Sequence, residues 1–521
     1  MKRTSLLTAL FFTFIATYAQ SKVFKEVSEG ISSQIKPIWQ DNNMVGYVVF
    51  TELEKASADS FNYKITIMDE NLNDIGTVKF RELKLGLYDV AFEQDVLCLA
   101  YWKSNFINCD FSNRRESKNA LADAKTWVFT QFLNLDGRII ASNSVKVDIK
   151  YSLGSSFTVK RLGVGKLKTD VLLKNIPQKG FACFYGDDSR NNLLVFNPAG
   201  KQIWQKTVQE DANDFYMLTS QQDVWILAKR KEKLLEGGYE LFGFNTKDST
   251  AAPKYILKDK KGSPLRVVTF DNDPATGKPF LAGNIIDTYK GNNLASPNQR
   301  ITGPYDGVFT IDFTGRRKAD IHENYTYWND GSQQGISKRG RWDSIRSYCR
   351  FEHAFRDYQG NTFFAGSAMR RKVRWGAIGA EVATAITVFG PAIIAMSSGS
   401  RKARLEDGLV VKMNAKGGLS VQNNVTLKPT VWAPAHAPFT YFDSRNYYHL
   451  TSSETKTNYL IVDDVKNNIT IYNVDKQKIL RTIPHTDGKI HTAILPAKDG
   501  HIMVSEYNEK EKYTRVSIES L

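Results

Sequence analysis

Apolar and polar residues alternate along most of this chain, in short runs that are separated by turn residues. Several runs end in a large apolar residue followed by Asn or Asp: Met68-Asp69, Leu133-Asn134, Phe196-Asn197, Phe244-Asn245, Ile311-Asp312, Met413-Asn414 and Tyr472-Asn473. In most copies Gly or Lys follows within a few residues, and a second alternating run comes next. Alternation is typical of strands with one buried face, and a Gly-containing turn joins two such strands. Each copy therefore predicts a β-hairpin.

The spacing of the copies predicts how the hairpins assemble. Successive copies lie about 50 to 65 residues apart, with one longer gap, which is the length of a four-stranded propeller blade rather than of a solenoid repeat. In the third repeat, strands are expected at 170–176, 180–185, 192–197 and 202–208. The sequence thus predicts an all-β protein with the fold of a β-propeller. The alternative is two unrelated β-sandwiches.

The two ends of the chain bear on the number of blades. After the last copy, strands are expected at 490–495, 501–506 and 513–518, which is one strand short of a blade. A strand-like piece from Lys22 to Val27 is left over before the first complete blade and can supply the missing outer strand. Closure by strands from both termini removes open sheet edges. We therefore predict eight four-stranded blades, with seven as the alternative.

The first 19 residues have the features of a secretory signal. Lys2 and Arg3 precede an apolar run from Leu6 to Tyr18, and the small residue Ala19 marks a cleavage point. The run is shorter than the roughly 20 residues of a membrane span, although an N-terminal anchor is the alternative. We expect residues 1–19 to be removed and residues 20–521 to form the propeller. The protein is then exported, and is periplasmic, associated with the outer membrane, or extracellular.

Charge and composition narrow the class of partner. The hydrophobic share of 42% is ample for a core, which excludes a disordered chain. The net charge of +15 comes from scattered bases. In an exported chain this favours an anionic lipid or polysaccharide surface over nucleic acid. Among the four cysteines, which show no CxxC spacing, Cys98 and Cys109 are the one pair that could form a disulfide.

One stretch carries a likeness to known repeats: Leu194-Val195-Phe196-Asn197-Pro198-Ala199-Gly200-Lys201-Gln202-Ile203-Trp204. It resembles the large propeller class that includes WD-repeat and quinoprotein-like proteins, and the resemblance extends over most of the mature chain. It implies architecture only, because the copies lack a regular Trp-Asp ending and the regular tryptophan of quinoprotein repeats. With the signal ending Tyr18-Ala19-Gln20, the chain also resembles uncharacterised secreted proteins of Bacteroidota. That resemblance implies a location and no reaction.

Long connections are expected on one face, between the second and third strands of a blade and between blades. They span 103–125, 148–167, 287–306, 326–347, 370–404 and 429–438. The aromatic side chains that we expect to bind a ligand there are Tyr289, Tyr305, Trp328, Trp342 and Trp432. Exposed aromatics suit stacking on sugars or anchoring a protein partner. The alternative is that they fold back over the blades.

The most unusual segment, residues 370–404, lies between the second and third strands of the sixth blade. An almost wholly apolar run from Trp375 to Met396 is interrupted by Gly390-Pro391 and flanked by bases. Because the strands on either side should be neighbours in one sheet, the run predicts a helical hairpin rather than a single span. Its expected contact residues are Arg370, Arg371, Lys372, Arg374, Trp375, Ile378, Phe389, Ile393, Arg401 and Lys402. It is expected to enter one leaflet of a membrane, to contact another protein, or to pack on the propeller.

Catalytic and metal-binding patterns are weak in this sequence. The loose group of His436, His449, His485 and His491 lacks the spacing of a metal site. We expect no metal and no cofactor. The predicted function is a non-enzymatic binding or scaffold protein of the cell envelope whose partner is a membrane surface or an envelope protein, with glycan as a further candidate. The alternative is a carbohydrate-active hydrolase or lyase, with carboxylates that meet at the axis of the long-loop face.

Overall fold

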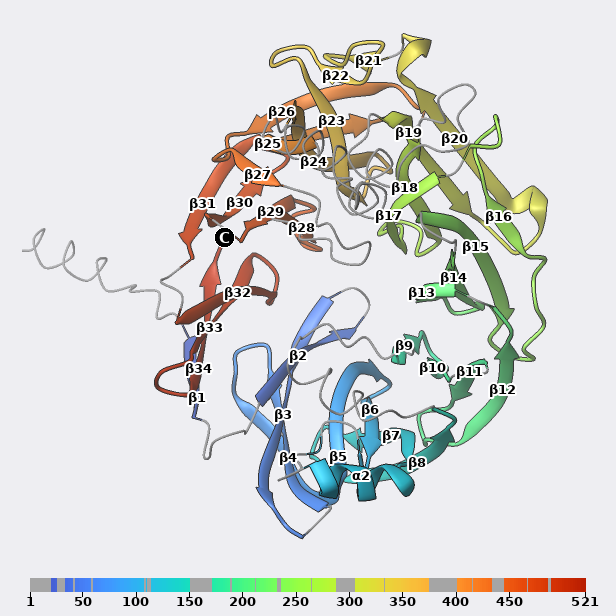
Figure 1. Ribbon diagram of the computed structural model, residues 1–521, viewed down its shortest axis with the longest axis vertical. Helices are drawn as coiled ribbons and strands as arrows, with labels where there is room; N and C mark the ends of the chain where they lie inside the picture. The colour runs from blue at the N-terminus through green and yellow to red at the C-terminus, as the bar shows by residue number, and fades with distance from the viewer. Residues whose placement is uncertain are drawn as a thin grey trace, which may run out of the picture.

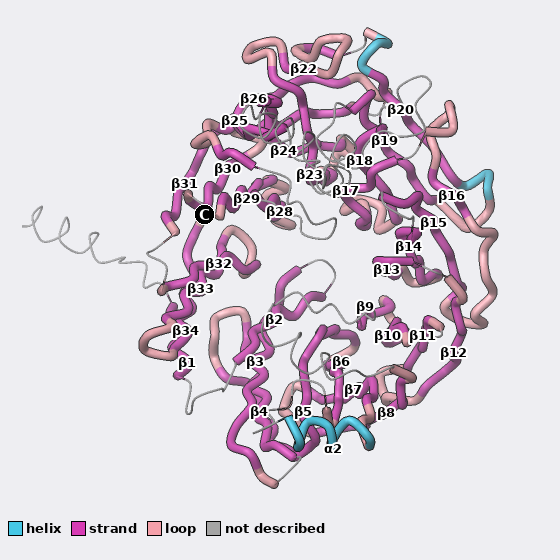
Figure 2. Tube along the Cα trace, viewed as in Figure 1, coloured by secondary structure: helices cyan, strands magenta, loops and turns pink. Residues whose placement is uncertain are grey.

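The computed structural model consists almost entirely of strands arranged around a central axis (Figures 1 and 2). It describes residues 20–25, 33–40, 43–57, 60–106, 109, 114–149, 171–187, 190–210, 212–231, 236–263, 265–286, 305–331, 333–373, 401–414, 416–432, 445–465, 467–485 and 489–521. Within these ranges the strands form five four-stranded sheets and two seven-stranded sheets. The protein is therefore an all-β propeller, as predicted. The predicted count of eight blades stays a prediction.

The four-stranded sheets each follow chain order, apart from the one that contains the first strand. The first two of these sheets are β9 (Val171–Ile176), β10 (Gly180–Gly186), β11 (Asn191–Phe196) and β12 (Gln202–Val208), and then β13 (Ala212–Thr219), β14 (Asp223–Lys231), β15 (Glu236–Asn245) and β16 (Tyr255–Leu257). The next two are β17 (Leu265–Asn272), β18 (Pro279–Ile286), β19 (Tyr305–Phe313) and β20 (Ile321–Tyr327), and then β28 (Arg445–Thr451), β29 (Asn458–Asp464), β30 (Asn468–Asn473) and β31 (Lys478–Pro484). The fifth sheet contains β32 (Ile490–Pro496), β33 (His501–Asn508), β34 (Tyr513–Ser520) and β1 (Gln20–Lys25). The strands predicted for the third repeat agree with β9 to β12 within one residue at each end.

In the two seven-stranded sheets, the series of hydrogen-bonded strands is longer. One contains β2 (Ser33–Gln40), β3 (Asn43–Lys55), β4 (Ser60–Asp69), β5 (Asp74–Glu93), β6 (Val96–Ser104), β7 (Thr126–Asn134) and β8 (Ile139–Val147). The other contains β21 (Gln333–Gln334), β26 (Leu419–Val425), β25 (Arg401–Met413), β24 (Thr362–Val373), β23 (Ser347–Arg356) and β22 (Arg341–Trp342), with β27 (Thr430–Trp432) paired to β25. The described helices are α2 (Arg114–Ala122), η2 (Lys318–Asp320) and η3 (Trp328–Asp330).

The long strand β5 belongs to two neighbouring sets of strands. Its first half, up to Leu83, pairs with β4, and its second half, from Lys84 onward, pairs with β6. The path of seven strands thus consists of two four-stranded sets that share one continuous strand.

The first and last strands of the ring pair with each other. β1 runs antiparallel to β34, in register from Gln20 opposite Ile518 to Lys25 opposite Tyr513. This confirms that an N-terminal strand completes the last sheet, two residues earlier than the sequence predicts. The edge of β34 is therefore covered, which removes a site for pairing with other chains.

Apolar side chains fill the spaces between neighbouring sheets. Phe132 of β7 packs against Phe181 of β10, with ring centroids 5.7 Å apart. Where the two ends of the chain meet, Met68 of β4 and Val516 of β34 belong to one buried cluster. Burying apolar surface is the main favourable term in folding, so the sheets support one another around the ring.

The recurring Asn or Asp has a local structural role. The side-chain oxygen of Asn134 accepts a hydrogen bond from the backbone N–H of Arg138 at 2.7 Å, and Asn197 makes the same bond to Lys201 at 2.9 Å. Such side chains close turns by replacing a backbone partner. The large apolar residue followed by Asn or Asp, which recurs in each repeat, therefore marks the start of the turn between the third and fourth strands.

Glycines in the second strands allow a close approach of the first strand. A Cβ atom at Gly283 would lie 2.0 Å from the carbonyl oxygen of Arg266, and one at Gly366 would lie 1.9 Å from that of Arg350. Both positions face register irregularities in β17 and β23. The glycines thus accommodate bulges within one sheet, rather than contact between sheets.

All four cysteines carry free thiols, so Cys98 and Cys109, the one pair that could form a disulfide, are not bonded. Cys98 lies in a buried cluster with Cys183. Burial raises the pKa of the Cys98 thiol well above its ordinary value. A buried, neutral thiol of this kind behaves as a small apolar side chain.

Candidate functional site

A cavity of about 750 Å³ lies at the axis, where the innermost strands end. Its lining includes Trp39, Asn43, Glu70, Lys174, Asn175, Thr219, Asp271, Asn272, Arg356, His449, Ser453, Glu454, Tyr459, Lys498, Asp499 and His501. This volume falls within the range of small-molecule sites, about 300 to 1,000 Å³. We call it the axial cavity.

The axial cavity lies at the turns between the first and second strands of successive sheets. Trp39 is the last residue but one of β2 and Asn43 begins β3. Asn272 ends β17, and Tyr459 is the second residue of β29. The long connections were expected on the opposite face, between second and third strands. The axial cavity is therefore walled by the short turns and not by the long connections of the opposite face.

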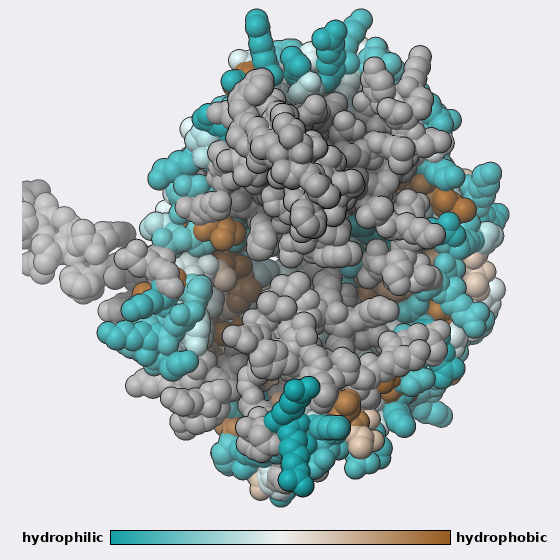
Figure 3. All heavy atoms as spheres, in the orientation of Figure 1, coloured by the Kyte–Doolittle hydropathy of each residue, from teal (hydrophilic) through white to brown (hydrophobic). Residues whose placement is uncertain are grey.

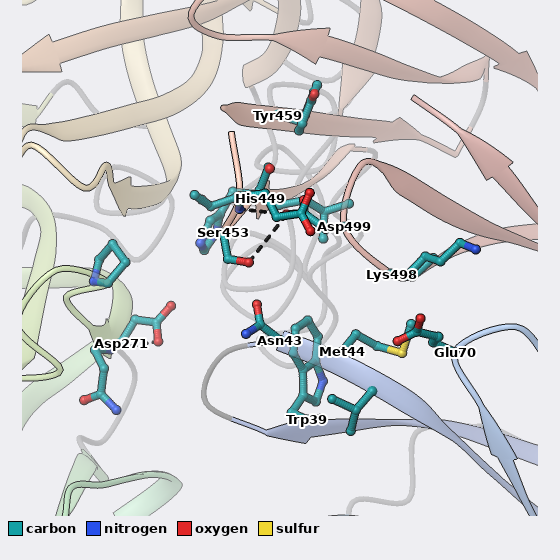
Figure 4. Close-up of a pocket in the computed structure, with 18 of the residues that line it drawn as sticks. Trp39, Asn43, Met44, Glu70, Asp271, His449, Ser453, Tyr459, Lys498 and Asp499 are labelled. Carbon is teal, nitrogen blue, oxygen red and sulfur yellow. Dashed lines mark hydrogen bonds between the residues drawn. The ribbon is translucent and has the colours of Figure 1, made fainter. Parts of the chain in front are cut away.

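Side chains from distant parts of the chain converge on the cavity (Figure 4). Trp39 and Asn43 lie on one side of the space, and Ser453 and Asp499 face them from the other. Asp271 approaches from a third direction. The Trp39 side chain is 40% exposed. The site thus combines an accessible indole with polar groups.

Hydrogen bonds between neighbouring sheets hold the wall of the cavity. The Thr219 hydroxyl donates to the carbonyl oxygen of Asn175 at 2.6 Å, and the Asn272 amide donates to the carbonyl oxygen of Thr219 at 3.1 Å. Further round the ring, the carboxylate of Asp499 accepts a hydrogen bond from the Glu454 N–H at 2.8 Å. These bonds fix the lining residues relative to one another, which reduces the ordering cost of binding.

Cations in the lining already face oxygen atoms of the protein. Arg356 lies 3.1 Å from the carboxylate of Asp273, and Lys498 donates to the side-chain oxygen of Asn71 at 2.6 Å. Burial raises the pKa of Asp89, and the positive charge of Lys174 opposes that rise. The described lining therefore does not gather these cations into an anion-binding cluster.

Two histidines pair at the edge of the cavity. Nε2 of His353 on β23 lies 2.8 Å from Nδ1 of His449 on β28, and the His449 ring stacks on Phe355 with centroids 5.1 Å apart. Burial, aided by the neighbouring imidazole, lowers the pKa of His353 to about 3. Burial also lowers the pKa of His449, although the charge of Asp271 opposes this effect. Both rings are therefore neutral near pH 7, with one N–H shared between them.

This pair predicts a loss of stability in acid. Below about pH 6.5 the unfolded chain binds protons on these histidines while the folded chain does not. The free energy of unfolding should therefore fall as the pH decreases from about 6.5 towards 3, by at most about 1.4 kcal/mol per pH unit for each proton. His353→Gln removes one titrating ring and keeps a hydrogen-bond donor. The free energy of unfolding of this variant should therefore decline less steeply with decreasing pH than that of the parent protein. Urea unfolding between pH 7.5 and 4.5 measures this.

The matched control is His491→Gln, whose ring is exposed and pairs with Glu509. It should follow the pH dependence of the parent protein. If the free energy of unfolding depends on pH equally steeply in His353→Gln and in the parent protein, the assigned role of the histidine pair is wrong.

The aromatic residues predicted to form the long-loop binding face are mostly buried. Tyr305, Trp328 and Trp342 are 3%, 3% and 6% exposed, and the Trp328 indole donates to the carbonyl oxygen of Tyr305 at 2.6 Å. These three rings pack inside the protein and do not offer a stacking surface. Tyr289 and the side chain of Trp432 lie outside the described residues.

The structure describes the base of the predicted hairpin. β24 and β25 pair beyond the sheet as far as Val373 opposite Arg401, which confirms that the strands flanking the insertion are neighbours. The stem contains Arg370, Arg371, Lys372, Arg401 and Lys402. Arg374, Trp375, Ile378, Phe389 and Ile393 lie outside the described residues, as does the predicted helical hairpin.

The late histidines do not assemble into one site. His485 lies 2.8 Å from Asp463, whereas His491 lies 2.6 Å from Glu509. Within the described ranges, no three or more His, Cys, Asp or Glu side chains are arranged to hold a metal ion. The helices described there are too short or too polar to cross a membrane.

Residues 1–111 match the model of a "Family of unknown function (DUF6770)". No curated protein matches the sequence.

Similar solved structures include the C-terminal WD40 domain of Sif2, with 8% identity, a TM-score of 0.43, and coverage of 96% of this chain and 99% of that one. BamB from Moraxella catarrhalis has 9% identity, a TM-score of 0.33, and coverage of 95% and 99%. The quinohemoprotein alcohol dehydrogenase ADHIIG from Pseudomonas putida HK5 has 8% identity, a TM-score of 0.40, and coverage of 96% and 78%. The resemblance to secreted proteins of Bacteroidota stays a prediction. By the arrangement of its own sheets, the chain is a β-propeller protein.

Proposed function

We propose that this protein is an exported, non-enzymatic binding propeller of the cell envelope, and that it docks on an anionic membrane surface through the β24–β25 stem. The observation that carries the proposal is the register of that stem. Arg370 lies opposite Arg404, Lys372 lies opposite Lys402, and Arg371 stands between them. Like charges in directly opposed positions are unfavourable in a sheet, so such a pairing needs an anionic partner to offset it.

Part of this charge is already neutralised within the protein. The Arg370 guanidinium lies 3.1 Å from the carboxylate of Glu406, which is also 4.0 Å from Arg404. Farther out along the stem are Arg371, Lys372, Arg401 and Lys402, adjacent to the apolar insertion. A basic segment beside an apolar one is the pattern of peripheral membrane attachment.

The described side chains around the periphery of the viewed face are mostly hydrophilic, with small apolar areas between them (Figure 3). Among the described residues, attachment to a membrane would therefore depend on a localised element, and the stem is an element with the required charge.

We expect the purified protein from residue 20 onward to float with vesicles that contain phosphatidylglycerol and not with phosphatidylcholine vesicles. Replacing Arg371, Lys372, Arg401 and Lys402 with Gln should weaken binding at least tenfold, because each base near such a surface contributes about 1 kcal/mol. Raised salt should weaken binding of the parent protein for the same reason.

The matched control replaces the exposed lysines Lys201, Lys247, Lys416 and Lys510 with Gln, which changes the net charge by the same amount. This control should float like the parent. A separate variant that lacks residues 375–400 tests the apolar part of the insertion. If the parent does not float, or if both sets of substitutions weaken flotation equally, the stem is not a membrane site.

The number of blades and the location are parts of the same proposal. Dividing β5 at Leu83, and counting β23 to β26 as one blade, gives eight four-stranded units. Export is part of the proposal because the expected cleavage after Ala19 would leave β1, Gln20–Lys25, within the mature chain. A mature N-terminus within β1 would contradict that cleavage point.

A second candidate function is a carbohydrate-active enzyme with its site at the axis. The specific observation in its favour is that Glu70, Asp271, Glu454 and Asp499 all line the axial cavity. Pairs of carboxylates perform glycoside hydrolysis. Asp499 already accepts a hydrogen bond from Glu454, and Asp271 accepts one from the Asn272 N–H at 2.8 Å, so both carboxylates are held by the wall.

A further inference from the structure

We propose that the axial cavity is a binding site for a neutral saccharide, with Trp39 as its stacking platform. This site is separate from the basic stem, and it does not depend on the proposed membrane attachment. Three features carry the proposal: the presentation of Trp39, the polar groups opposite it, and the charge balance of the lining.

The backbone presents Trp39 at the cavity instead of burying it. The register between β2 and β3 shifts at this residue, since Ile38 pairs with Gly46 but Trp39 pairs with Met44. Such a bulge changes the direction of a side chain and is common beside functional sites. The indole stays 40% exposed, whereas the neighbouring Ile38 is 3% exposed. An accessible indole face suits the C–H face of a pyranose ring.

The polar groups that line the cavity around Trp39 match the hydroxyls of a sugar. Asn43 offers both a donor and an acceptor, Asp271 and Asp499 offer acceptors, and Ser453 and Tyr459 carry hydroxyls (Figure 4). A sugar hydroxyl both donates and accepts, so a lining with both kinds of group can satisfy it. An apolar ligand would displace water from these polar groups without replacing the hydrogen bonds that the water makes, which is unfavourable.

The charge of the lining favours a neutral ligand over an anion. Arg356 faces Asp273, Lys498 faces Asn71, and Lys174 lies near Asp89. Glu70, Asp271, Glu454 and Asp499 add negative charge to the same space. A phosphate or sulfate group would therefore meet carboxylates rather than uncommitted cations.

The size and rigidity of the site also fit an oligosaccharide. The volume of about 750 Å³ is larger than one sugar ring requires and lies within the range of ligand pockets. The lining is held by bonds between sheets, such as those of Thr219 to Asn175 and of Asn272 to Thr219. A weakly binding sugar gains affinity when the site is ordered beforehand.

The experiment is saturation-transfer NMR with neutral trisaccharides of glucose, xylose and N-acetylglucosamine. Inorganic phosphate is the anionic probe, and its binding is followed by the broadening of its phosphorus NMR line. We expect transfer to the C–H protons of at least one trisaccharide and no binding of phosphate. Trp39→Ala should weaken binding at least tenfold, while Trp39→Phe should weaken it less. Asp271→Asn should also weaken binding, because a carboxylate that accepts from hydroxyls becomes a neutral amide.

The matched control is Tyr448→Ala, which removes an aromatic residue of similar exposure, 47%, next to His449 but outside the cavity lining. It should bind like the parent. Circular dichroism checks that each variant is folded, and because Trp39 is exposed we expect unchanged spectra. Absence of binding by all three trisaccharides would overturn the proposal. So would equal binding by the parent and Trp39→Ala, or binding of phosphate in place of sugar.

Discussion

Deleting residues 20–25 should destabilise the protein by several kcal/mol and cause concentration-dependent association beyond that of the parent protein. β1 is the outer strand of the sheet that contains β34, and the two strands pair over six residues. Each lost backbone hydrogen bond costs about 1 kcal/mol. Deletion also removes Phe24 from the apolar cluster where the ends of the chain meet. The exposed edge of β34 would then be free to pair with other molecules.

Chemical unfolding and light scattering after size-exclusion chromatography measure the two effects. The matched control is Lys22→Ala, which removes the ion pair with Asp74 and a hydrogen bond to the carbonyl oxygen of Leu72 but leaves the backbone pairing of β1 in place. Such partly exposed interactions contribute about 0 to 1 kcal/mol, so this variant should keep the oligomeric state of the parent and be nearly as stable. A deletion variant with the stability and the oligomeric state of the parent would mean that β1 does not close the ring.

Arg445→Met should lower the free energy of unfolding by about 3 to 5 kcal/mol. The Arg445 side chain is fully buried, and its Nε lies 2.9 Å from the carboxylate of Asp464. It also donates to the hydroxyl of Ser367 at 2.9 Å and to the carbonyl oxygen of Lys428 at 2.7 Å. Substitution removes a buried charge that holds β28 against the preceding sheet, and leaves the buried carboxylate without its facing cation.

The matched control for this prediction is Arg515→Met. Arg515 pairs with Glu506 at the surface, at 2.5 Å, and its loss should cost less than about 1 kcal/mol. The double variant Arg445→Met/Asp464→Leu should regain part of the lost stability, because both members of the buried pair are then apolar. Equal effects of Arg445→Met and Arg515→Met in urea unfolding would contradict the assigned role of Arg445.

The strand arrangement could be predicted from the sequence because its signals are local. Alternation defines each strand, and the Asn at positions such as Asn134 and Asn197 closes the following turn through its own side chain. The closing strand was also predictable, since a strand was missing at one end and left over at the other. Its register could not be predicted, because pairing with β34 depends on residues almost 500 positions away.

The axial cavity could not be predicted, because its residues share no sequence spacing. His449 is a clear example: the sequence groups it with His485, but its ring contacts His353 on another sheet. The exposure of a side chain also depends on residues that are distant in the sequence. Trp328 and Trp342 occur in long polar connections yet are buried, while Trp39 belongs to a strand and is exposed through a bulge.

Hydrogen–deuterium exchange of the protein from residue 20 onward, with and without phosphatidylglycerol vesicles, tests the docking of the β24–β25 stem most directly. The account predicts slower exchange at residues 370–373 and 401–404 when vesicles are present, with unchanged exchange in β9 to β12 on a distant part of the ring. Unchanged exchange in the stem while the protein is bound to vesicles would contradict it, because the protein would then attach through another surface.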